Sequence, residues 1–284
     1  MFASILSLLA ATAYGVGDFF GTVGTRRSHP ILVSFIGHIF YAITALVGLW
    51  VFQGTWTSDA ITFGIATGAS EAIGFLVFYF ALGMGQVSLV APLVSVIYAV
   101  VPVVWGLVSG DSLSPLSWVG LGIGLLAVLF LSIETGETNL FSKRPLFIVL
   151  SLALVGGIMW GLSTVTLSYV PEDSGMVPVF IAGLTAFGLL AATVLVRRKM
   201  VIPQWNGSAL VPSMFSGLLF GIANLLIVTA LRFGSLSLVG LLTALYPLAT
   251  VLLARFVLHE PTSRTQWVGV AVAITAAALL SQTS

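Results

Sequence analysis

The chain has 284 residues, of which 58% are hydrophobic and only 7% are charged, and its formal net charge is +1. A soluble domain carries roughly 25% charged residues, so this composition excludes a soluble globular protein. The sequence holds no cysteine, which excludes disulfides, thiolate catalysis and cysteine metal sites.

Apolar stretches follow one another along the chain with short joints between them. A helix needs about 20 predominantly apolar residues to cross a bilayer. The sequence predicts such helices over 2–24, 30–53, 60–81, 87–109, 115–133, 145–168, 175–196, 208–231, 236–258 and 265–282. The predicted fold class is therefore an all-α polytopic membrane protein with about ten transmembrane helices.

The second half of the chain repeats the pattern of the first. Phe75–Ser132 aligns with Asn224–Ser281 at a constant offset of 149 residues, and Trp118-Val119-Gly120 falls on Trp267-Val268-Gly269. We predict a first five-helix repeat over 1–134, a connecting loop over 135–144 and a second five-helix repeat over 145–284. Two related halves predict a substrate path between them that opens alternately to each side.

The basic residues are concentrated in alternate joints. Nine of the ten Lys and Arg residues lie in or beside odd-numbered joints: Arg26, Arg27, Lys143, Arg144, Arg197, Arg198, Lys199, Arg255 and Arg264. The positive-inside rule places these joints in the cytoplasm and both termini outside. Arg232 is the one base in an even-numbered joint, where it is either an external gate or an interface anchor.

Prolines interrupt one predicted helix of each half. Pro92 and Pro102 lie in the helix over 87–109, and Pro247 lies in the helix over 236–258. Proline frees a backbone carbonyl and lets a transmembrane helix bend where protein or a water-filled cavity satisfies that carbonyl. We expect opposed bending of these two helices to gate the path. Asp111 and Glu260, which align between the halves, are expected to cap joints or helix ends.

Three segments carry a family resemblance. Tyr14–Gly21 (YGVGDFFG) ends the first helix, and Leu89–Val104 (LVAPLVSVIYAVVPVV) and Leu238–Leu253 (LVGLLTALYPLATVLL) each precede an acidic joint. Together they resemble EamA-type members of the drug/metabolite transporter (DMT) superfamily over essentially the whole chain. The resemblance implies a bacterial inner-membrane carrier that exports amino acids, metabolites or toxic compounds.

The resemblance also implies a central cavity, lined chiefly by helices 1, 3, 4, 6, 8 and 9, with helices 5 and 10 peripheral. The resemblance and the charge pattern disagree about the orientation of the chain in the membrane. Family members usually keep both termini in the cytoplasm, whereas the Lys and Arg residues of this chain predict the reverse.

Polar residues at membrane depth are the first site candidates, because burying a charge there is costly. Glu71, mid-way along the third helix, is the proton-coupling candidate, with a structural hydrogen-bonded carboxyl as the alternative. Asp18 either takes part in gating or proton transfer or pairs with Arg26 or Arg27. Asn224 aligns with Phe75, one turn beyond Glu71, and either binds substrate or holds a neighbouring helix.

Aromatic residues are the second group of candidates, since their faces attract organic cations. The predicted cavity aromatics are Tyr14, Tyr79, Tyr98, Trp160 and Tyr246. Trp160-Gly161 occupies the position of Tyr14-Gly15 in the other half. His38, in the second helix, is expected to be a helix-packing residue.

These features predict a secondary transporter that exports a small metabolite, amino acid or drug-like solute by alternating access, coupled to protons through Glu71. The alternative is a channel, or a uniporter or exchanger without proton coupling. An enzyme is not expected, because the sequence has no HExxH, GxSxG or P-loop motif and its three histidines are scattered. We predict no cofactor, metal or nucleic-acid partner, contacts with membrane lipids, and a monomer or homodimer.

Overall fold

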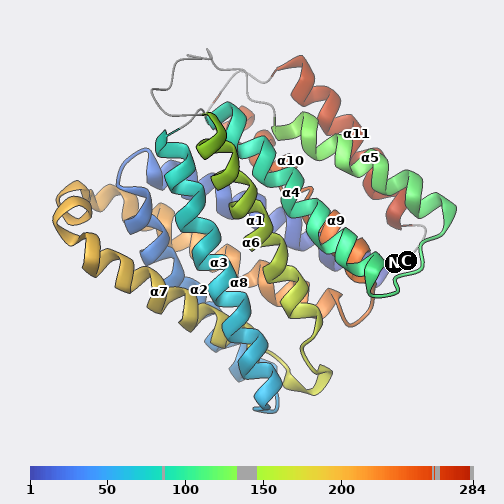
Figure 1. Cartoon of the computed structure of the whole chain (residues 1–284), viewed down its shortest axis with the longest axis horizontal. Coiled ribbons are helices and arrows are strands. Elements are labelled where there is room, and N and C mark those ends of the chain that lie inside the picture. The colour runs from blue at the N-terminus through green and yellow to red at the C-terminus, as the bar shows by residue number, and fades with distance from the viewer. Residues whose placement is uncertain (85–86, 133–145, 258, 260–262, 282–284) are drawn as a thin grey trace.

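The computed structural model describes residues 1–84, 87–132, 146–257, 259 and 263–281, and these residues fold into helices and short joints (Figure 1). The helices are α1 (Phe2–Thr25), α2 (Pro30–Val51), α3 (Ser58–Met84), α4 (Val87–Val108), α5 (Pro115–Ser132), α6 (Leu146–Ser168), α7 (Val177–Val201), α8 (Leu210–Ala230), α9 (Leu236–Thr243), α10 (Pro247–Val257) and α11 (Arg264–Ser281). Single 3₁₀ turns lie in the joints at Glu172–Ser174, Ile202–Gln204 and Gly207–Ala209.

The helices have the length and composition of membrane spans. Within the described residues, seven segments are long and apolar enough to cross a bilayer, with α9 and α10 together counted as the segment Leu236–Val257. Three further apolar helices are shorter: Val94–Val108, Pro115–Leu131 and Arg264–Leu280. The predicted all-α polytopic membrane fold is confirmed.

The two halves interleave instead of forming separate bundles. α1 packs against α8, α9 and α10, and α6 packs in the same way against α3 and α4. α2 contacts α8 as α7 contacts α3, and the pairs α2–α7, α4–α9 and α5–α11 join equivalent helices. Exchanging each helix for its sequence counterpart leaves this set of contacts unchanged. Each half therefore packs against the other around a two-fold relation.

Close helix approach depends on glycine at the crossing points. A Cβ atom at Gly15 of α1 would collide with the Tyr246 carbonyl oxygen, and one at Gly68 of α3 would collide with the Ala182 carbonyl oxygen of α7. Small residues at such crossings let helix backbones touch in a membrane, where no hydrophobic force drives them together.

The helix predicted over 236–258 is interrupted, which corrects its expected course. α9 ends at Thr243, and α10 begins at Pro247 after a turn over 244–246. Proline has no N–H for the helical hydrogen bond, and the turn closes with shorter-range bonds such as Tyr246 N–H to the Thr243 carbonyl at 3.1 Å. The backbone of α4 continues through Pro92 and Pro102 without a break. The expected bending is thus seen as an interruption at Pro247 alone.

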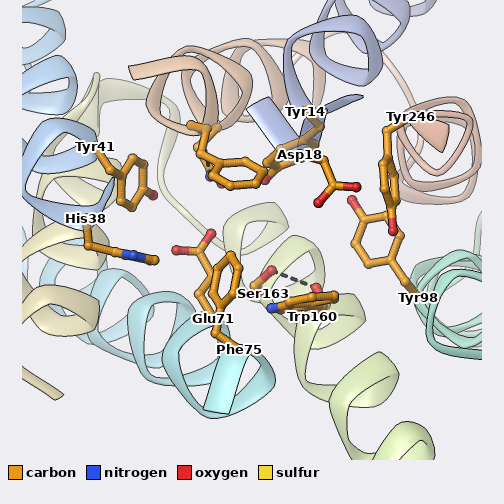
Figure 2. A pocket seen from close by; sticks show the side chains of 12 residues that line it. Tyr14, Asp18, His38, Tyr41, Glu71, Phe75, Tyr98, Trp160, Ser163 and Tyr246 are labelled. Atoms are coloured by element: carbon orange, nitrogen blue, oxygen red, sulfur yellow. Dashed lines mark hydrogen bonds between the residues drawn. The ribbon is translucent and has the colours of Figure 1, made fainter. Parts of the chain in front are cut away.

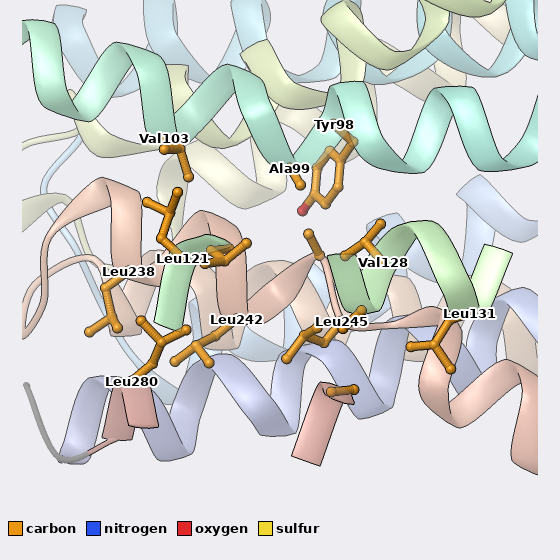
Figure 3. Packing of buried hydrophobic residues seen from close by; sticks show 14 of the residues in the cluster. Tyr98, Ala99, Val103, Leu121, Val128, Leu131, Leu238, Leu242, Leu245 and Leu280 are labelled. Atoms are coloured by element: carbon orange, nitrogen blue, oxygen red, sulfur yellow. The ribbon is translucent and has the colours of Figure 1, made fainter. Parts of the chain in front are cut away.

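The α5–α11 pair covers one side of the molecule. Leu121 and Val128 of α5 pack with Leu280 of α11 against Tyr98 and Leu245 in a hydrophobic cluster (Figure 3). This packing leaves α5 and α11 away from the space between α1, α3, α6 and α8.

Candidate functional site

A cavity of about 80 Å³ lies between the two halves (Figure 2). Side chains from α1, α2, α3, α4, α6, α8 and the α9–α10 turn line it: Tyr14, Asp18, His38, Tyr41, Glu71, Phe75, Tyr98, Trp160, Ser163, Phe220, Asn224 and Tyr246. These helices are the six that the resemblance implies, with α2 in addition. The lining contains two carboxyl groups and no Lys or Arg.

Glu71 lies at one end of the cavity and is only 6% exposed. It faces Asn224 of α8 and Tyr41 of α2, so polar groups from both halves surround the carboxyl group. The Asn224 amide donates to the Phe220 carbonyl oxygen at 3.2 Å, which fixes its orientation within α8. The Glu71 carboxylate also acts electrostatically on Tyr14 and Tyr98.

The Tyr41 hydroxyl is the α2 neighbour of Glu71 at this end. Its side chain is 2% exposed and points toward the Glu71 carboxyl group in Figure 2. The carboxyl group is the hydrogen-bond partner of this hydroxyl. A buried hydroxyl without a partner would cost roughly 1–3 kcal/mol of free energy, so the contact helps to hold α2 against α3.

His38 completes the α2 contribution. Its Nδ1 lies 2.8 Å from the Ser34 carbonyl oxygen, one turn back. The imidazole packs edge-on against Phe75, with ring centroids 5.2 Å apart. His38 therefore has the packing contacts that were expected. It also lines the cavity, although the resemblance does not place the second helix among the cavity-lining helices.

The other end of the cavity is aromatic. Tyr246 lies 6.1 Å from Tyr98 and 6.5 Å from Tyr14, measured between ring centroids. The Tyr246 hydroxyl hydrogen-bonds with Ser95 at 3.0 Å, which ties the α9–α10 turn to α4. Asp18 lies among these three tyrosines in Figure 2. Trp160 forms the adjoining wall, with its ring centroid 5.0 Å from that of Phe75.

Seven of the residues chosen from the sequence meet in this one cavity: Glu71, Asp18, Asn224, Tyr14, Trp160, Tyr98 and Tyr246. Tyr79 lies in α3, but its side chain is outside the described residues, as is that of Pro92 in α4. Tyr41, Phe75, Ser163 and Phe220 were missed. The alignment of Phe75 with Asn224 was a signal for one of them, and the spacing of Tyr41 three residues after His38 was a signal for another.

Arg232 and Pro102, two of the gate candidates, do not line the cavity. Arg232 donates from Nη2 to the Gly175 carbonyl oxygen at 3.2 Å, which joins the α8–α9 joint to the α6–α7 joint. Pro102 of α4 lies against Gly240 of α9. Asp111, after α4, accepts from the Ser237 N–H at 2.9 Å and so caps the start of α9. Its expected capping role is seen, but on a helix of the other half.

Comparison with known sequences gives the family. Residues 147–282, from α6 to α11, match the EamA-like transporter family. The second half of the chain therefore carries an EamA-like domain, as its motifs indicated. The helices around this domain are those of a multi-pass membrane protein.

Two further relatives bear on this EamA-type chain. An uncharacterized protein of Methanocaldococcus jannaschii is 29% identical over 134 residues, which are 46% of this chain and 97% of that protein. A solved structure, described only as a crystal structure of a protein, superposes over 99% of this chain and 96% of its own, with a TM-score of 0.77 and 18% identity. At that identity the likeness shows the fold alone.

Proposed function

We propose that this EamA-type chain is a secondary carrier of the bacterial inner membrane that exports small organic cations in exchange for protons. The observation that carries the proposal is the buried Glu71 carboxyl group at a cavity whose lining holds no Lys or Arg side chain. An amino acid or metabolite would qualify through an amine group.

The need to compensate the negative charge of Glu71 supports the exchange of an organic cation for a proton. An ionised carboxylate buried away from water is strongly unfavourable unless a proton or a cation compensates it. His38, Tyr41, Asn224, Tyr14 and Asp18 face the same space, and none of them carries a fixed positive charge. A proton and an organic cation therefore compete for the carboxylate, and this competition couples their movements.

The aromatic walls support an organic cation over an inorganic one. Tyr14, Tyr98 and Tyr246 surround the Asp18 end, and Trp160 and Phe75 lie between the two carboxyl groups (Figure 2). Aromatic faces attract cations by roughly 0.5–2 kcal/mol each and offer apolar area to the rest of a solute. An anionic or phosphorylated solute would need Arg or Lys in the lining.

The arrangement of the halves supports alternating access. The cavity lies where helices of one half cross those of the other, as in carriers built from inverted repeats. The interruption at Pro247 places a short turn against α1 and α4, where a change of helix direction moves Tyr246. By the positive-inside rule the joint with Arg27 faces the cytoplasm, and export runs from that side.

The position of Asn224 supports an alternative function without proton coupling. Because it lies beside Glu71, the carboxyl group has a protein partner and could serve helix packing in a uniporter or exchanger without proton coupling. The two functions differ in their response to a proton gradient.

Purified protein in liposomes tests the proposal. An imposed proton gradient should drive uptake of a primary arylalkylamine, and Glu71→Gln should abolish this drive while the protein stays folded. Glu172→Gln, which removes an exposed carboxylate in the α6–α7 joint, is the matched control. Gradient-driven uptake that persists in Glu71→Gln would contradict coupling through this residue.

A further inference from the structure

The cavity holds a second carboxyl group, that of Asp18, which the proposed function does not use. Glu71 lies at one end of the cavity, and Asp18 lies at the other end among Tyr14, Tyr98 and Tyr246 (Figure 2). The two carboxyl groups come from different helices, α3 and α1. The Asp18 end is therefore a second place at which a solute can be held.

The surroundings of Asp18 suit a positive charge. Tyr246 lies 6.1 Å from Tyr98 and 6.5 Å from Tyr14, measured between ring centroids. The Asp18 carboxylate acts electrostatically on Tyr246. Aromatic faces attract cations, and among the described residues that line the cavity none is Lys or Arg. An ammonium group at this end would thus meet both a carboxylate and aromatic rings.

A belt of aromatic rings connects the two ends. Phe75 lies one turn after Glu71 in α3, on the same face of that helix. Tyr14 lies one turn before Asp18 in α1, again on the same face. Phe220 of α8 contacts both rings, with its centroid 5.9 Å from that of Phe75 and 5.5 Å from that of Tyr14. The belt offers apolar surface to a hydrocarbon stem that runs from one carboxyl group to the other.

The two carboxyl groups are close enough for one small solute to reach both. Glu71 acts electrostatically on Tyr98, and Asp18 acts on Tyr246. The ring centroids of these two tyrosines lie 6.1 Å apart. An ionised carboxyl group at membrane depth is costly unless a positive charge compensates it, and a monoamine compensates only one of the two.

We infer that the cavity binds a linear diamine as a dication, with one ammonium group at Glu71 and the other at Asp18. The inference rests on the proposed function as a cation carrier and names its substrate class. Tyr41 and Asn224 are hydrogen-bond partners of Glu71. An ionised carboxylate has about four acceptor positions, so an ammonium group can join these two partners. The methylene stem lies along the aromatic belt, and Asp18 determines specificity for the second charge.

A monoamine of the same length is the discriminating comparison. It carries a methyl group in place of one ammonium group, so it can use the Glu71 end and the aromatic belt but not the charge of Asp18. A hydrogen bond to a charged group contributes enough that its loss weakens binding about ten-fold or more. The diamine should therefore bind more tightly than its matched monoamine by this factor.

Calorimetry on the purified full chain compares putrescine with pentylamine and hexamethylenediamine with heptylamine. In the wild type, the diamine whose length fits should bind about ten-fold or more tightly than its matched monoamine. Asp18→Asn keeps the shape of the side chain and removes its charge, so this preference should disappear while the monoamine binds nearly as before. Asp59→Asn, which removes an exposed carboxylate at the start of α3, should keep the preference.

The outcomes separate the two proposals. Monoamine binding by Asp18→Asn reports that the variant is folded, and the comparison within the wild type does not depend on any variant. A wild type without preference for either diamine would overturn the diamine site and leave the cation carrier standing. A preference that survives in Asp18→Asn, or equal weakening of both cations there, would do the same. Failure of the wild type to bind any of the four amines would overturn the carrier proposal, and the diamine site with it.

Discussion

At the residue scale, the chain holds a carboxyl group at membrane depth by surrounding it with polar groups from two other helices. Tyr41 and Asn224 face Glu71 from α2 and α8, and His38 lies beside them. A buried ionisable residue in a membrane is costly and almost always faces an interior cavity or a partner. Glu71 does both, which is why we assign function to it.

A different residue, His29, gives a pH prediction outside the membrane-spanning segments. Its Nδ1 accepts from the Ile31 N–H at 3.2 Å and caps α2. Partial burial lowers the pKa of His29 from its ordinary value. Because the folded pKa lies below the unfolded one, the cap contributes above the unfolded pKa and is lost as pH falls through the folded pKa.

Acidification from neutral pH to below the folded pKa of His29 should therefore remove a cap worth about 1 kcal/mol. His29→Asn keeps a capping oxygen that does not titrate, so its melting temperature should fall less than that of the wild type over this range. Thermal unfolding in detergent measures the difference. Parallel pH profiles for the two proteins would contradict the role of His29.

At the element scale, the fold depends on helix crossings too close for a side chain. α3 crosses α7 at Gly68, and α1 crosses the α9–α10 turn at Gly15. Both crossings join one half to the other.

Gly68→Ala should destabilise the protein, because its Cβ would collide with the Ala182 carbonyl oxygen. Overpacking of this kind costs roughly 1–3 kcal/mol. Gly122→Ala is the control, since nothing lies within 4 Å of a Cβ there. Unfolding in a denaturing detergent series should separate the two variants, and equal stability would show that the crossing tolerates a methyl group.

The Asp111 cap on α9, which joins the two halves, gives a second prediction about the helices. Asp111 accepts from the Ser237 N–H at the start of α9. Asp111→Ala should lower stability by about 1 kcal/mol, while Asp111→Asn keeps an acceptor and should retain most of it. The same unfolding series measures this, and an Asn variant as unstable as the Ala variant would show that the negative charge matters more than the hydrogen bond.

At the scale of the whole molecule, the interleaved halves place the cavity between them. The absence of cysteine permits a clean test of the orientation. Ser109→Cys, in the α4–α5 joint, should react with an impermeant maleimide applied outside intact cells. Ser208→Cys, in the α7–α8 joint, should react only after the membrane is opened. The reverse pattern would invert the predicted topology.

The sequence predicted the helices and much of the cavity lining for a physical reason. Spans are set by local apolar length, and polar residues such as Glu71 and Asn224 stand out against an apolar background. The spacing of Tyr41 three residues after His38 put the two on one face of their helix, but helix periodicity does not say which helix of a bundle faces a cavity. The interruption before Pro247 was foreseen as a bend, whereas α4 continues as a helix through Pro102, which lies against Gly240.

The interleaving of the two halves could also not be predicted from the sequence. The repeat showed that the halves correspond, but not that α1 packs on α8 or α6 on α3. Those contacts join residues far apart in the chain, and apolar stripes on both helices leave the choice of partner open. The relative from Methanocaldococcus jannaschii is matched over 97% of its length by 46% of this chain, a share close to that of one half.

The most direct test of competition at Glu71 is proton release on binding. Phenethylamine is added to the purified protein in weakly buffered detergent, and the pH of the solution is recorded together with the extent of binding. The account predicts that each bound cation displaces a proton in the wild type and that Glu71→Gln releases none. Binding without proton release in the wild type, or equal release in Glu71→Gln, would contradict the exchange of a cation for a proton at this carboxyl group.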